Sequence, residues 1–498
     1  MKLKKVMHVL LLIGMGLMIP CYAFTVLNVL LSPWPLYERS RMLLSLLTIG
    51  CALALLLGMR VLDRHEAFFA KHEKRLLAFA ALFYFVVQMA MAHALRFVPK
   101  TDAEQCFTAA QLIVDTGTFG NVERPWVYFT RYPFNLGFVY LLAGVFRFFG
   151  FIGWGDRFMQ VVLVCSVLFT LGLLSGARVV RRMGGARAQT RFLLLAASCL
   201  PFLYCTTELY TDAFSLAFPT MTIYCFVRLR DASDRRGRVL WALGFALCAF
   251  AGAQIKFTSV IAAIACVIAL VFEQRRSRSA LAALLTLCVF VLGGAAVDHY
   301  TYTHLPKADI EKNELPRLHH IAMGLPIHED EGYGQYGSGG WLYFSTSFED
   351  PQERKAALLT EIIDRVYYLR YPNRMLNMMS RKNLSTFGDG TFALSEIIQA
   401  DNYTVDNAVK QVIFFAGRYS RAYYYLCTAM FMAQMIAAGL ACAQAIRRRE
   451  TTGAALFIAL VGMFLILCAW ETRARYFFQF EMVLLCAGAL LDSHRKDA

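Results

Sequence analysis

Two acidic side chains, Asp102 and Glu104, follow a long apolar segment that ends near Phe97. A carboxylate at such a boundary between apolar core and water can accept a proton from a hydroxyl group, or it can hold a divalent cation. The stretch from 103 to 114 has the pattern of an amphipathic helix lying flat on a bilayer, and Gly117 follows it. We predict that both acids are catalytic; the alternative is that they are solvated loop acids.

The composition identifies the elements that must position these acids. Of the 498 residues, 58% are hydrophobic and only 17% are charged, and the mean hydropathy is +0.48. A water-soluble globular protein of this composition could not cover its apolar residues. The sequence therefore predicts an all-α polytopic membrane protein with about 12–13 transmembrane helices. We expect spans near residues 6–31, 41–61, 76–97, 134–150, 157–177, 191–206, 208–227, 239–254, 257–272, 279–297, 421–446, 453–470 and 475–491, the first of them an uncleaved anchor.

The net charge of +15 has a simple explanation in this framework. Basic residues gather in short gaps between the apolar segments, as the positive-inside rule requires, so no nucleic-acid partner is needed. These gaps are Lys2 to Lys5 and residues 60–75, 178–191, 228–238, 273–278, 447–450 and 494–496. We predict a cytoplasmic N-terminus in the cell membrane, with residues 98–130, 298–420 and 470–476 on the extracytoplasmic side; Arg39 and Arg41 go weakly against this assignment.

A chain changes sides of the membrane at every span, and the number of spans predicted between residues 130 and 178 does not fit this rule. Two apolar segments, 134–150 and 157–177, lie between a predicted outside residue 130 and a predicted inside residue 178. Alternation allows only an odd number of crossings there. Either the first segment is a re-entrant or tilted interfacial element, or one basic gap is assigned to the wrong side.

The predicted spans divide the chain into four regions. Residues 1–75 form N-terminal spans, 76–297 a larger membrane module with the outside loop 98–130, 298–420 an outer loop, and 421–498 the last spans. An outer loop of this length is too long to be a mere connection. Nearly all of the fourteen cysteines fall in apolar segments, Cys106 being the exception, so we expect neither a disulfide framework nor a thiolate zinc site.

Further charged and aromatic residues recur at the predicted outer boundary. Glu208 and Asp212 follow an apolar segment, where acids are usually functional, although a helix N-terminus would also favour them. The sequence "RAR", which contains Arg473 and Arg475, lies outside on this topology, against the positive-inside rule. A function in ligand binding would explain these charges; the alternative is an interfacial anchor.

Taken in order, these segments resemble the GT-C superfamily of integral-membrane glycosyltransferases, which includes bacterial aminoarabinose transferases and protein O-mannosyltransferases. The resemblance covers most of residues 76–300. It rests on the membrane-proximal acid and amphipathic helix, followed by "YFTRYPFNLGFVYLLAGVFRFFG" (128–150), "PFLYCTTELYTDAFSLAFPTMTIYCFVRLR" (201–230) and "GAQIKFTSVIAAIACVIALVF" (252–272). It implies a GT-C-like bundle with a mixed extracytoplasmic loop.

Three later segments narrow the resemblance. They are "PRLHHIAMGLPIHEDEGYGQYG" (316–337), "RKNLSTFGDGTF" (381–392) and "WETRARYFFQF" (470–480). They are similar to segments of mannosyltransferase-like membrane proteins of Gram-positive bacteria, most of which are assigned to cell-envelope glycosylation, although Phe387 and Gly388 stand where a tryptophan is common. The implied reaction moves a hexosyl or mannosyl group from a polyprenyl-phosphate donor to an envelope polysaccharide, a teichoic-acid-like polymer or a protein.

The resemblance also implies roles for individual residues. Asp102, with Glu104, would activate the acceptor, and Lys256, Arg473 and Arg475 would hold the donor phosphate. Predicted substrate-binding residues are Arg131, Tyr132, Glu208, Asp212, Tyr333 and Tyr476. The resemblance implies no certain cofactor, and a divalent cation is one that the site could use. The expected partners are the lipid bilayer, the polyprenyl-phosphate-linked sugar and the envelope acceptor.

Two other functions are compatible with a polytopic chain. A transporter or flippase of envelope precursors would be expected to show repeated halves and charges at mid-bilayer. A non-catalytic envelope-assembly protein would need no acidic and basic set around one groove. The glycosyltransferase hypothesis requires Asp102, Lys256 and Arg475 to lie within about one ligand's width of each other.

Three loop features have simpler interpretations. His319 and His320 are expected to pack the loop rather than bind metal, and Asp389 is expected to be a turn residue. Tyr333 and Tyr336 could stack on a sugar ring or pack the loop.

Overall fold

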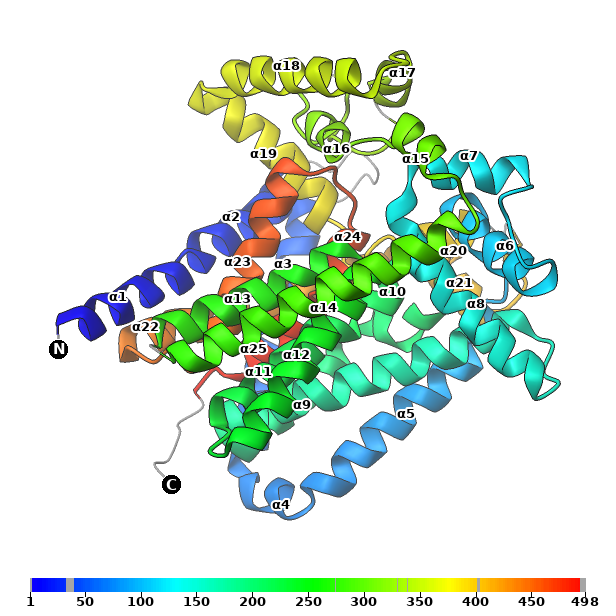
Figure 1. The fold of residues 1–498 in the computed structure, drawn as a ribbon. Coiled ribbons are helices and arrows are strands. Elements are labelled where there is room, and N and C mark those ends of the chain that lie inside the picture. The colour runs from blue at the N-terminus through cyan, green and yellow to red at the C-terminus, as the bar shows by residue number, and fades with distance from the viewer. Residues whose placement is uncertain are drawn as a thin grey trace.

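The computed structural model describes residues 2–32, 40–273, 275–328, 330–337, 339–400 and 404–492. Within these ranges the protein is all α-helical and contains no strand, which confirms the predicted fold class (Figure 1). Arg39 and the basic segment 494–496 lie outside the described residues.

Apolar helices account for every predicted span. Among the described residues, eight helices are long and apolar enough to cross a membrane: Lys4–Leu31 (α1, Lys2–Gly16, with α2, Met18–Leu31), α3 (Arg41–Arg64), α5 (Glu73–Ala94), Pro133–Phe151 (containing α8, Leu136–Phe151), α9 (Arg157–Ser198), α12 (Arg235–Ile255), α14 (Arg276–Tyr302) and α22 (Ser420–Arg448). Shorter apolar helices are α11 (Ala217–Asp231), α13 (Val260–Phe272), α23 (Ala454–Ala469) and α25 (Glu481–Ala489). The protein is therefore a multi-pass membrane protein.

Helix α9 is two helical arms joined at a glycine. Gly185 has φ +81°, which interrupts the helix within the basic segment 178–191. Arginines of this segment pair with acids at the start of α4 (Glu66–Lys71) and of α5: Arg181 with Glu73 at 2.8 Å, and Arg187 with Glu66 at 2.6 Å. Only the second arm, which ends at Ser198, corresponds to the predicted span 191–206.

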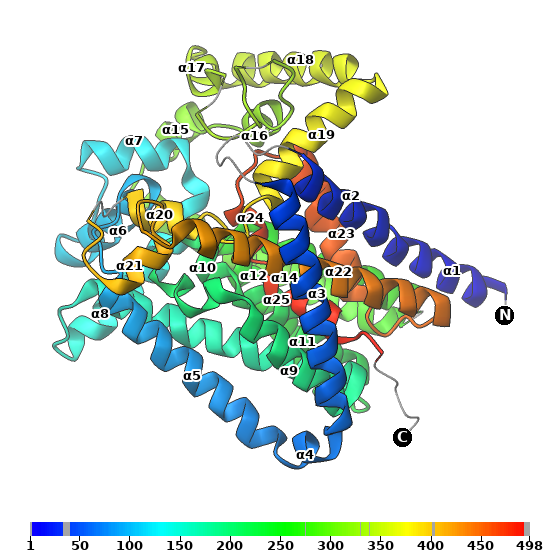
Figure 2. The ribbon, with the colours of Figure 1, turned by 180° about the vertical axis from the view of Figure 1, so that it is seen from behind.

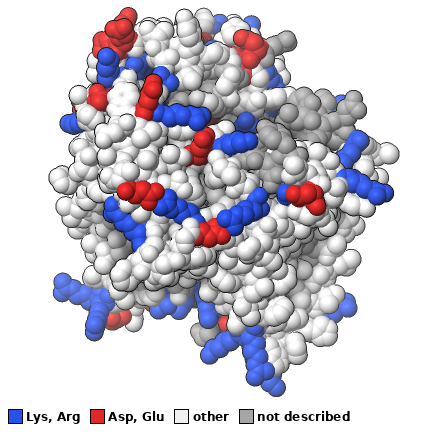
Figure 3. All heavy atoms as spheres, turned by 90° about the vertical axis from the view of Figure 1, so that its right-hand side faces the viewer, with Lys and Arg blue, Asp and Glu red and all other residues white. Residues whose placement is uncertain are grey.

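The bundle has two distinct ends. We call the end that carries residues 96–135, 303–419 and 470–475 the loop end, and the end that carries α4 and Gly185 the basic end (Figures 1 and 2). Seen from the side that carries α6, α7 and α8, charged side chains lie at the top, in a row across the middle and at the bottom, with a largely uncharged surface between the row and the bottom (Figure 3). This distribution suits a chain whose middle is surrounded by lipid.

Helix α8 does not connect the two ends. At its start, the Leu315 N–H donates to the Arg131 carbonyl oxygen over 3.1 Å. Beyond its end, Asp156 pairs with Arg96 at 2.8 Å, next to the loop end of α5. Both ends of α8 therefore lie at the loop end, which favours the interfacial alternative for residues 134–150 and removes the conflict in the number of crossings.

The loop end is built from short helices. They are α6 (Thr101–Asp115), α7 (Glu123–Arg131), α10 (Thr211–Ser215), α15 (Lys307–Asn313), α16 (Arg317–Met323), α17 (Trp341–Thr346), α18 (Pro351–Leu369), α19 (Pro372–Phe387), α20 (Leu394–Ala400), α21 (Ala408–Ile413) and α24 (Arg475–Phe478). Part of the outer loop has its own small core around Met323, Trp341 and Leu358. A buried ion pair between Arg365 and Glu331, at 2.5 Å, stabilises the same part.

Cys106 also behaves as an apolar residue. Its side chain on α6 is fully buried, and the neighbouring Phe107 packs edge-to-face on Phe146 of α8 with ring centroids 5.1 Å apart. The described cysteines are all free.

Candidate functional site

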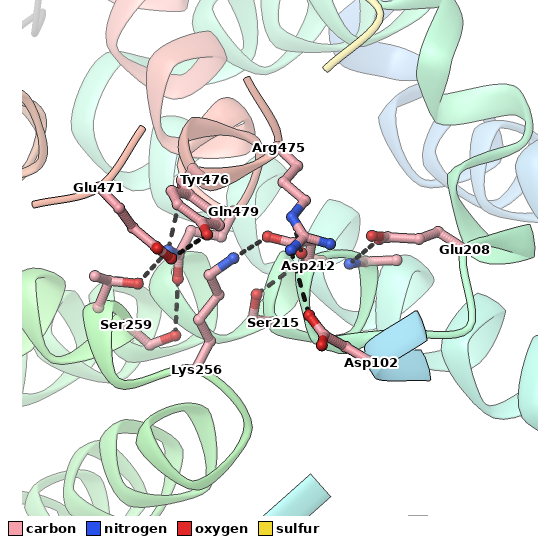
Figure 4. A network of polar contacts seen from close by, with 12 residues as sticks. Asp102, Glu208, Asp212, Ser215, Lys256, Ser259, Glu471, Arg475, Tyr476 and Gln479 are labelled. Carbon is pink, nitrogen blue, oxygen red and sulfur yellow. Dashed lines mark hydrogen bonds and ion pairs between the residues drawn. The ribbon is translucent and has the colours of Figure 1, made fainter. Parts of the chain in front are cut away.

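A buried carboxylate on α10 organises the charges at the loop end. The Asp212 side chain is fully buried, and its Oδ1 forms an ion pair with the Lys256 ammonium group. Its Oδ2 lies 3.6 Å from Nε of Arg475. Figure 4 shows these three side chains converging from α10, from the end of α12 and from α24.

Helix ends position this cluster. Glu208 precedes α10, and its Oε2 accepts a hydrogen bond from the Ala213 N–H over 3.0 Å, which satisfies a free donor in the first turn of that helix. Its other oxygen is buried without a hydrogen-bond partner among the described residues. Lys256 directly follows α12 in an extended conformation, with φ −150°. The helix thus delivers the lysine at the loop end of the bundle.

Asp102 borders the cluster on its open side. It lies in the first turn of α6, its side chain is 43% exposed, and its Oδ2 is 3.9 Å from Nη2 of Arg475. The preceding Thr101 has φ +54°, a left-handed conformation that is unusual for a β-branched residue. Arg475 therefore lies between Asp102 and Asp212 (Figure 4), and the structure brings Asp102, Lys256 and Arg475 into one cluster.

Two tyrosines shield the cations. The Lys256 ammonium nitrogen lies 4.6 Å from the ring centroid of Tyr476, and the Arg475 guanidinium carbon lies 5.2 Å from that of Tyr210. Cation–π contacts of this kind stabilise positive charge away from water. Tyr476 was predicted from the sequence to contact substrate, whereas Tyr210 was not predicted.

Glu471 is a functional candidate that the sequence analysis did not select. Its Oε1 accepts a hydrogen bond from the Tyr476 hydroxyl, and its Oε2 lies 3.5 Å from Nδ1 of His320. Burial would raise the pKa of Glu471, but contact with His320, then with Tyr476 and Arg475, lowers it to about 2. The sequence did contain a signal for Glu471, because this acid lies in "WETRARY", two residues before Arg473.

Two selected residues lie apart from the cluster. Glu104 pairs with the exposed Arg124 at 3.4 Å, and Arg473 pairs with Glu396 at 3.1 Å. Neither contact involves Asp212 or the residues around it. The structure therefore places Asp102 and Arg475 in the cluster, and Glu104 and Arg473 outside it.

Three of the predicted substrate-binding residues, Arg131, Tyr132 and Tyr333, take part in hydrogen bonds that involve the outer loop. The hydroxyl oxygens of Tyr132 and Tyr336 are 3.0 Å apart, which joins the turn before α8 to the outer loop. The Tyr333 carbonyl oxygen accepts a hydrogen bond from the Thr472 hydroxyl over 2.8 Å, so Tyr333 ties the loop to the segment before α24. The Arg131 carbonyl also bonds to the outer loop, as described above. Through Tyr333, the outer loop is therefore bonded to the segment that leads to Arg475.

The histidines and Asp389 pack the loop end. Nδ1 of the buried His319 lies 2.7 Å from the Ser345 hydroxyl oxygen, and the His320 ring stacks on Trp470 with centroids 5.0 Å apart. Burial lowers the pKa of His319 to about 4. Asp389 accepts a hydrogen bond from the Thr391 N–H over 2.8 Å, in the manner of an Asx turn. Among the described residues, no group of three or more His, Cys, Asp or Glu side chains is placed to hold a metal ion.

The buried Lys382 joins two loop segments of the loop end to each other. The Lys382 ammonium nitrogen donates to the carbonyl oxygens of Trp470, over 2.6 Å, and of Gly324. Its side chain is 2% exposed. Burial lowers the pKa of Lys382 to about 7, against the opposing influence of Cys468 and Glu471.

This lysine predicts a pH dependence of stability. Between pH 7 and about 10.4, the usual pKa of lysine, the unfolded chain binds the proton that the folded chain has released, so stability rises with pH. The contribution is at most about 1.4 kcal/mol per pH unit. We expect the thermal unfolding midpoint in detergent to rise between pH 7 and 9, and Lys382→Met to reduce this slope. The exposed Lys307 supplies the control, because Lys307→Met should leave the change of the unfolding midpoint with pH as it is in the wild type. If Lys382→Met also leaves this change as it is, Lys382 does not cause the pH dependence.

Comparisons with known proteins place the chain in a family. A protein-family model described as "Conserved hypothetical integral membrane protein" matches residues 2–495. No curated protein matches the chain. Solved structures with similarity include ArnT from Cupriavidus metallidurans bound to undecaprenyl phosphate, with 13% identity, coverage of 85% of this chain and 78% of that chain, and a TM-score of 0.36. The apo state of the same protein has 14% identity, the same coverage and a TM-score of 0.34. TM-scores this low do not establish a shared fold. Because the family model spans almost the whole sequence, the chain belongs to this family of conserved hypothetical integral membrane proteins.

Proposed function

We propose that the protein is a membrane glycosyltransferase of the GT-C type that uses a polyprenyl-phosphate-linked sugar. The observation that carries this proposal is the cluster at the loop end, where a half-exposed carboxylate, Asp102, lies beside Arg475, and where Asp212 contacts both Arg475 and a second cation, Lys256. A lipid-borne donor presents its phosphate and sugar at this boundary, while its tail stays in the bilayer. A hexosyl or mannosyl group and an envelope acceptor are the specific substrates we propose.

The geometry supports a direct displacement. Asp102 takes the proton from an acceptor hydroxyl group as the hydroxyl oxygen forms a bond to the anomeric carbon of the sugar. The bond between that carbon and the phosphate oxygen breaks, and the electron pair leaves with the polyprenyl phosphate. Lys256 and Arg475 stabilise the negative charge that develops on this phosphate. A single displacement inverts the configuration at the anomeric carbon.

Asp212 has a positioning role in this proposal. It holds Lys256 and Arg475 from opposite carboxylate oxygens, so both cations face the same small region before the donor arrives. Glu208 adds a second buried acid next to them. In the proposed orientation the basic end is cytoplasmic and the loop end faces the outside, in agreement with the positive-inside rule.

The function is tested in two steps. Envelope glycans of cells with and without the protein are compared by mass spectrometry, and the missing residue identifies the sugar and acceptor. Purified protein in proteoliposomes is then incubated with the matching polyprenyl-phosphate sugar and the acceptor. We expect transfer with inversion and release of polyprenyl phosphate. Unchanged glycans, together with no transfer from polyprenyl-phosphate hexoses, would overturn the proposal.

A matched pair of arginines tests the donor-phosphate site. Arg475→Gln removes a cation that faces Asp102 and Asp212, whereas Arg473→Gln removes one that pairs with Glu396 outside the cluster. A hydrogen bond to a charged group contributes about 1.5–3 kcal/mol. We therefore expect Arg475→Gln to lower kcat/KM for the donor roughly 10- to 150-fold and Arg473→Gln to change it little. Equal losses in both variants would contradict the assignment.

A further inference from the structure

The connection between α18 and α19 exposes an unusual set of side chains. We call residues 363–376 the elbow. Its exposed apolar and aromatic residues are Ile363, Val366, Tyr367, Tyr368, Tyr371, Met375 and Leu376, each between 37% and 65% exposed. Contiguous apolar patches of this kind on a surface mark sites that bind a protein or a membrane.

The exposed face of α18 is not needed to fold the loop. The opposite face already packs inward, where Leu358 and Leu369 belong to the two small cores of the outer loop. Arg365 on that face forms the buried ion pair with Glu331. Ile363 and Val366 point away from these contacts, so α18 carries a second apolar face without a partner among the described residues.

The elbow carries one exposed acid, Asp364, near its start, and its remaining charges are positive. The segment from Arg365 to Gly388 contains no acidic residue. The Arg370 guanidinium carbon lies 3.5 Å from the ring centroid of Tyr367 and 4.4 Å from that of Tyr371. Arg374 lies 4.8 Å from the same Tyr371 ring. Tyrosine rings with arginines stacked on them are typical of the headgroup region of a membrane, where the ring is half in apolar surroundings and the cation meets phosphate.

The anchoring of α19 brings the elbow close to the lipid. The Asn28 side-chain N–H of the membrane helix α2 donates to the Ser380 carbonyl oxygen over 2.8 Å, and Asn383 donates to Thr25 over 2.8 Å. Helix α2 ends at Leu31, one turn after Asn28. The start of α19 is two turns before Ser380, about 12 Å along the helix. Figures 1 and 2 show α18 lying across the top of the molecule and α19 descending from it to α2.

We propose that the elbow docks onto the bilayer surface at the loop end, with its apolar and tyrosine side chains in the interfacial region and Arg370 and Arg374 on lipid phosphates. This contact would hold the outer loop at the membrane surface in addition to the hydrogen bonds between α19 and α2. The aliphatic side chains Ile363, Val366 and Leu376 favour lipid over an acidic glycan, because glycans offer polar surfaces to such residues. The inference does not depend on the proposed enzymatic function.

Photo-crosslinking in nanodiscs tests the contact. The full chain is reconstituted with a phospholipid that carries a photoreactive group near its headgroup, in either neutral or anionic discs, and crosslinks are mapped by mass spectrometry. We expect labelling of peptides from residues 363–376 and stronger labelling in anionic discs. The α17 peptide is the internal control, because α17 lies at the far end of α18 from α19 (Figure 1) and its Tyr343 is 81% exposed. Elbow labelling no greater than that of α17 would overturn the proposal.

Two sets of variants separate the apolar and the charged contributions. Tyr367→Ser with Tyr371→Ser and Leu376→Ser should reduce elbow labelling at least several-fold in both kinds of disc. Arg370→Gln with Arg374→Gln should retain labelling in neutral discs and lose the increase in anionic ones. All five side chains are exposed, so the fold should survive, and labelling of the membrane helix α5 reports on this in the same sample. If a soluble acidic polysaccharide protects the elbow while lipid does not label it, the surface binds glycan and the proposal is overturned.

Discussion

Replacing Asp102 with asparagine is expected to lower kcat for sugar transfer by a factor of about 10²–10⁴, the usual contribution of a general base. Asparagine has nearly the same size but cannot take the acceptor proton. Because Lys256 and Arg475 stay in place, KM for the lipid-linked donor should remain close to the wild-type value. Initial rates in proteoliposomes at varied donor concentration measure both constants.

The neighbouring acid provides a matched control for this change. Glu104→Gln alters a carboxylate on the same helix turn, but one that pairs with the exposed Arg124 instead of Arg475. We expect its transfer rate to stay within about twofold of wild type, because exposed ion pairs contribute little. If the two variants lose activity equally, or if Asp102→Asn keeps full activity, Asp102 is not the base.

The Asp212→Asn variant should be strongly destabilised, by about 3–5 kcal/mol, because it removes the buried carboxylate that pairs with both Lys256 and Arg475. Asp212 is fully buried, and the side chains of Lys256 and Arg475 are only 15% and 20% exposed. The thermal unfolding midpoint of the detergent-purified protein measures the loss. Transfer activity should fall as well, since the two cations would no longer be held toward one region.

An exposed pair and a double substitution complete this test. Asp115→Asn breaks the contact of a half-exposed acid with Arg157 and should cost no more than about 1 kcal/mol. Adding Lys256→Met to Asp212→Asn removes one of the uncompensated charges and should recover part of the stability, although not the activity. If Asp212→Asn unfolds at the wild-type temperature, the ion pairs around it do not stabilise the fold.

Hydropathy alone predicted the membrane helices well, because lipid requires long apolar helices whose backbone groups are paired internally. It predicted less well how the helices join. The basic segment 178–191 was expected to be a connection, but the helix continues through it and breaks only at Gly185. Whether residues 134–150 cross could not be decided from the sequence, because the deciding ion pairs join Arg96 to Asp156 and Arg157 to Asp115 across distant parts of the chain.

For the site, the residue types were predictable and their grouping was only partly so. Asp102 and Glu104 are two residues apart on α6, and two residues on a helix are about 200° apart around its axis. Arg473 and Arg475 are also two residues apart, but Arg473 lies in the non-helical segment before α24, whereas Arg475 begins that helix. One member of each pair can therefore face the cluster while the other faces away, and the sequence did not indicate which. The central place of Asp212 between two cations depends on contacts over more than forty residues, which no local pattern encodes.

The return of α8 to the loop end has a consequence for the ends of the polypeptide. With this segment left out, twelve of the thirteen predicted spans remain, and because twelve is even we expect α1 to begin and α25 to end in the same compartment. Reporters fused before α1 and after α25 would then share one environment. An enzyme that works only in the cytosol, joined to either terminus, should be active in both fusions.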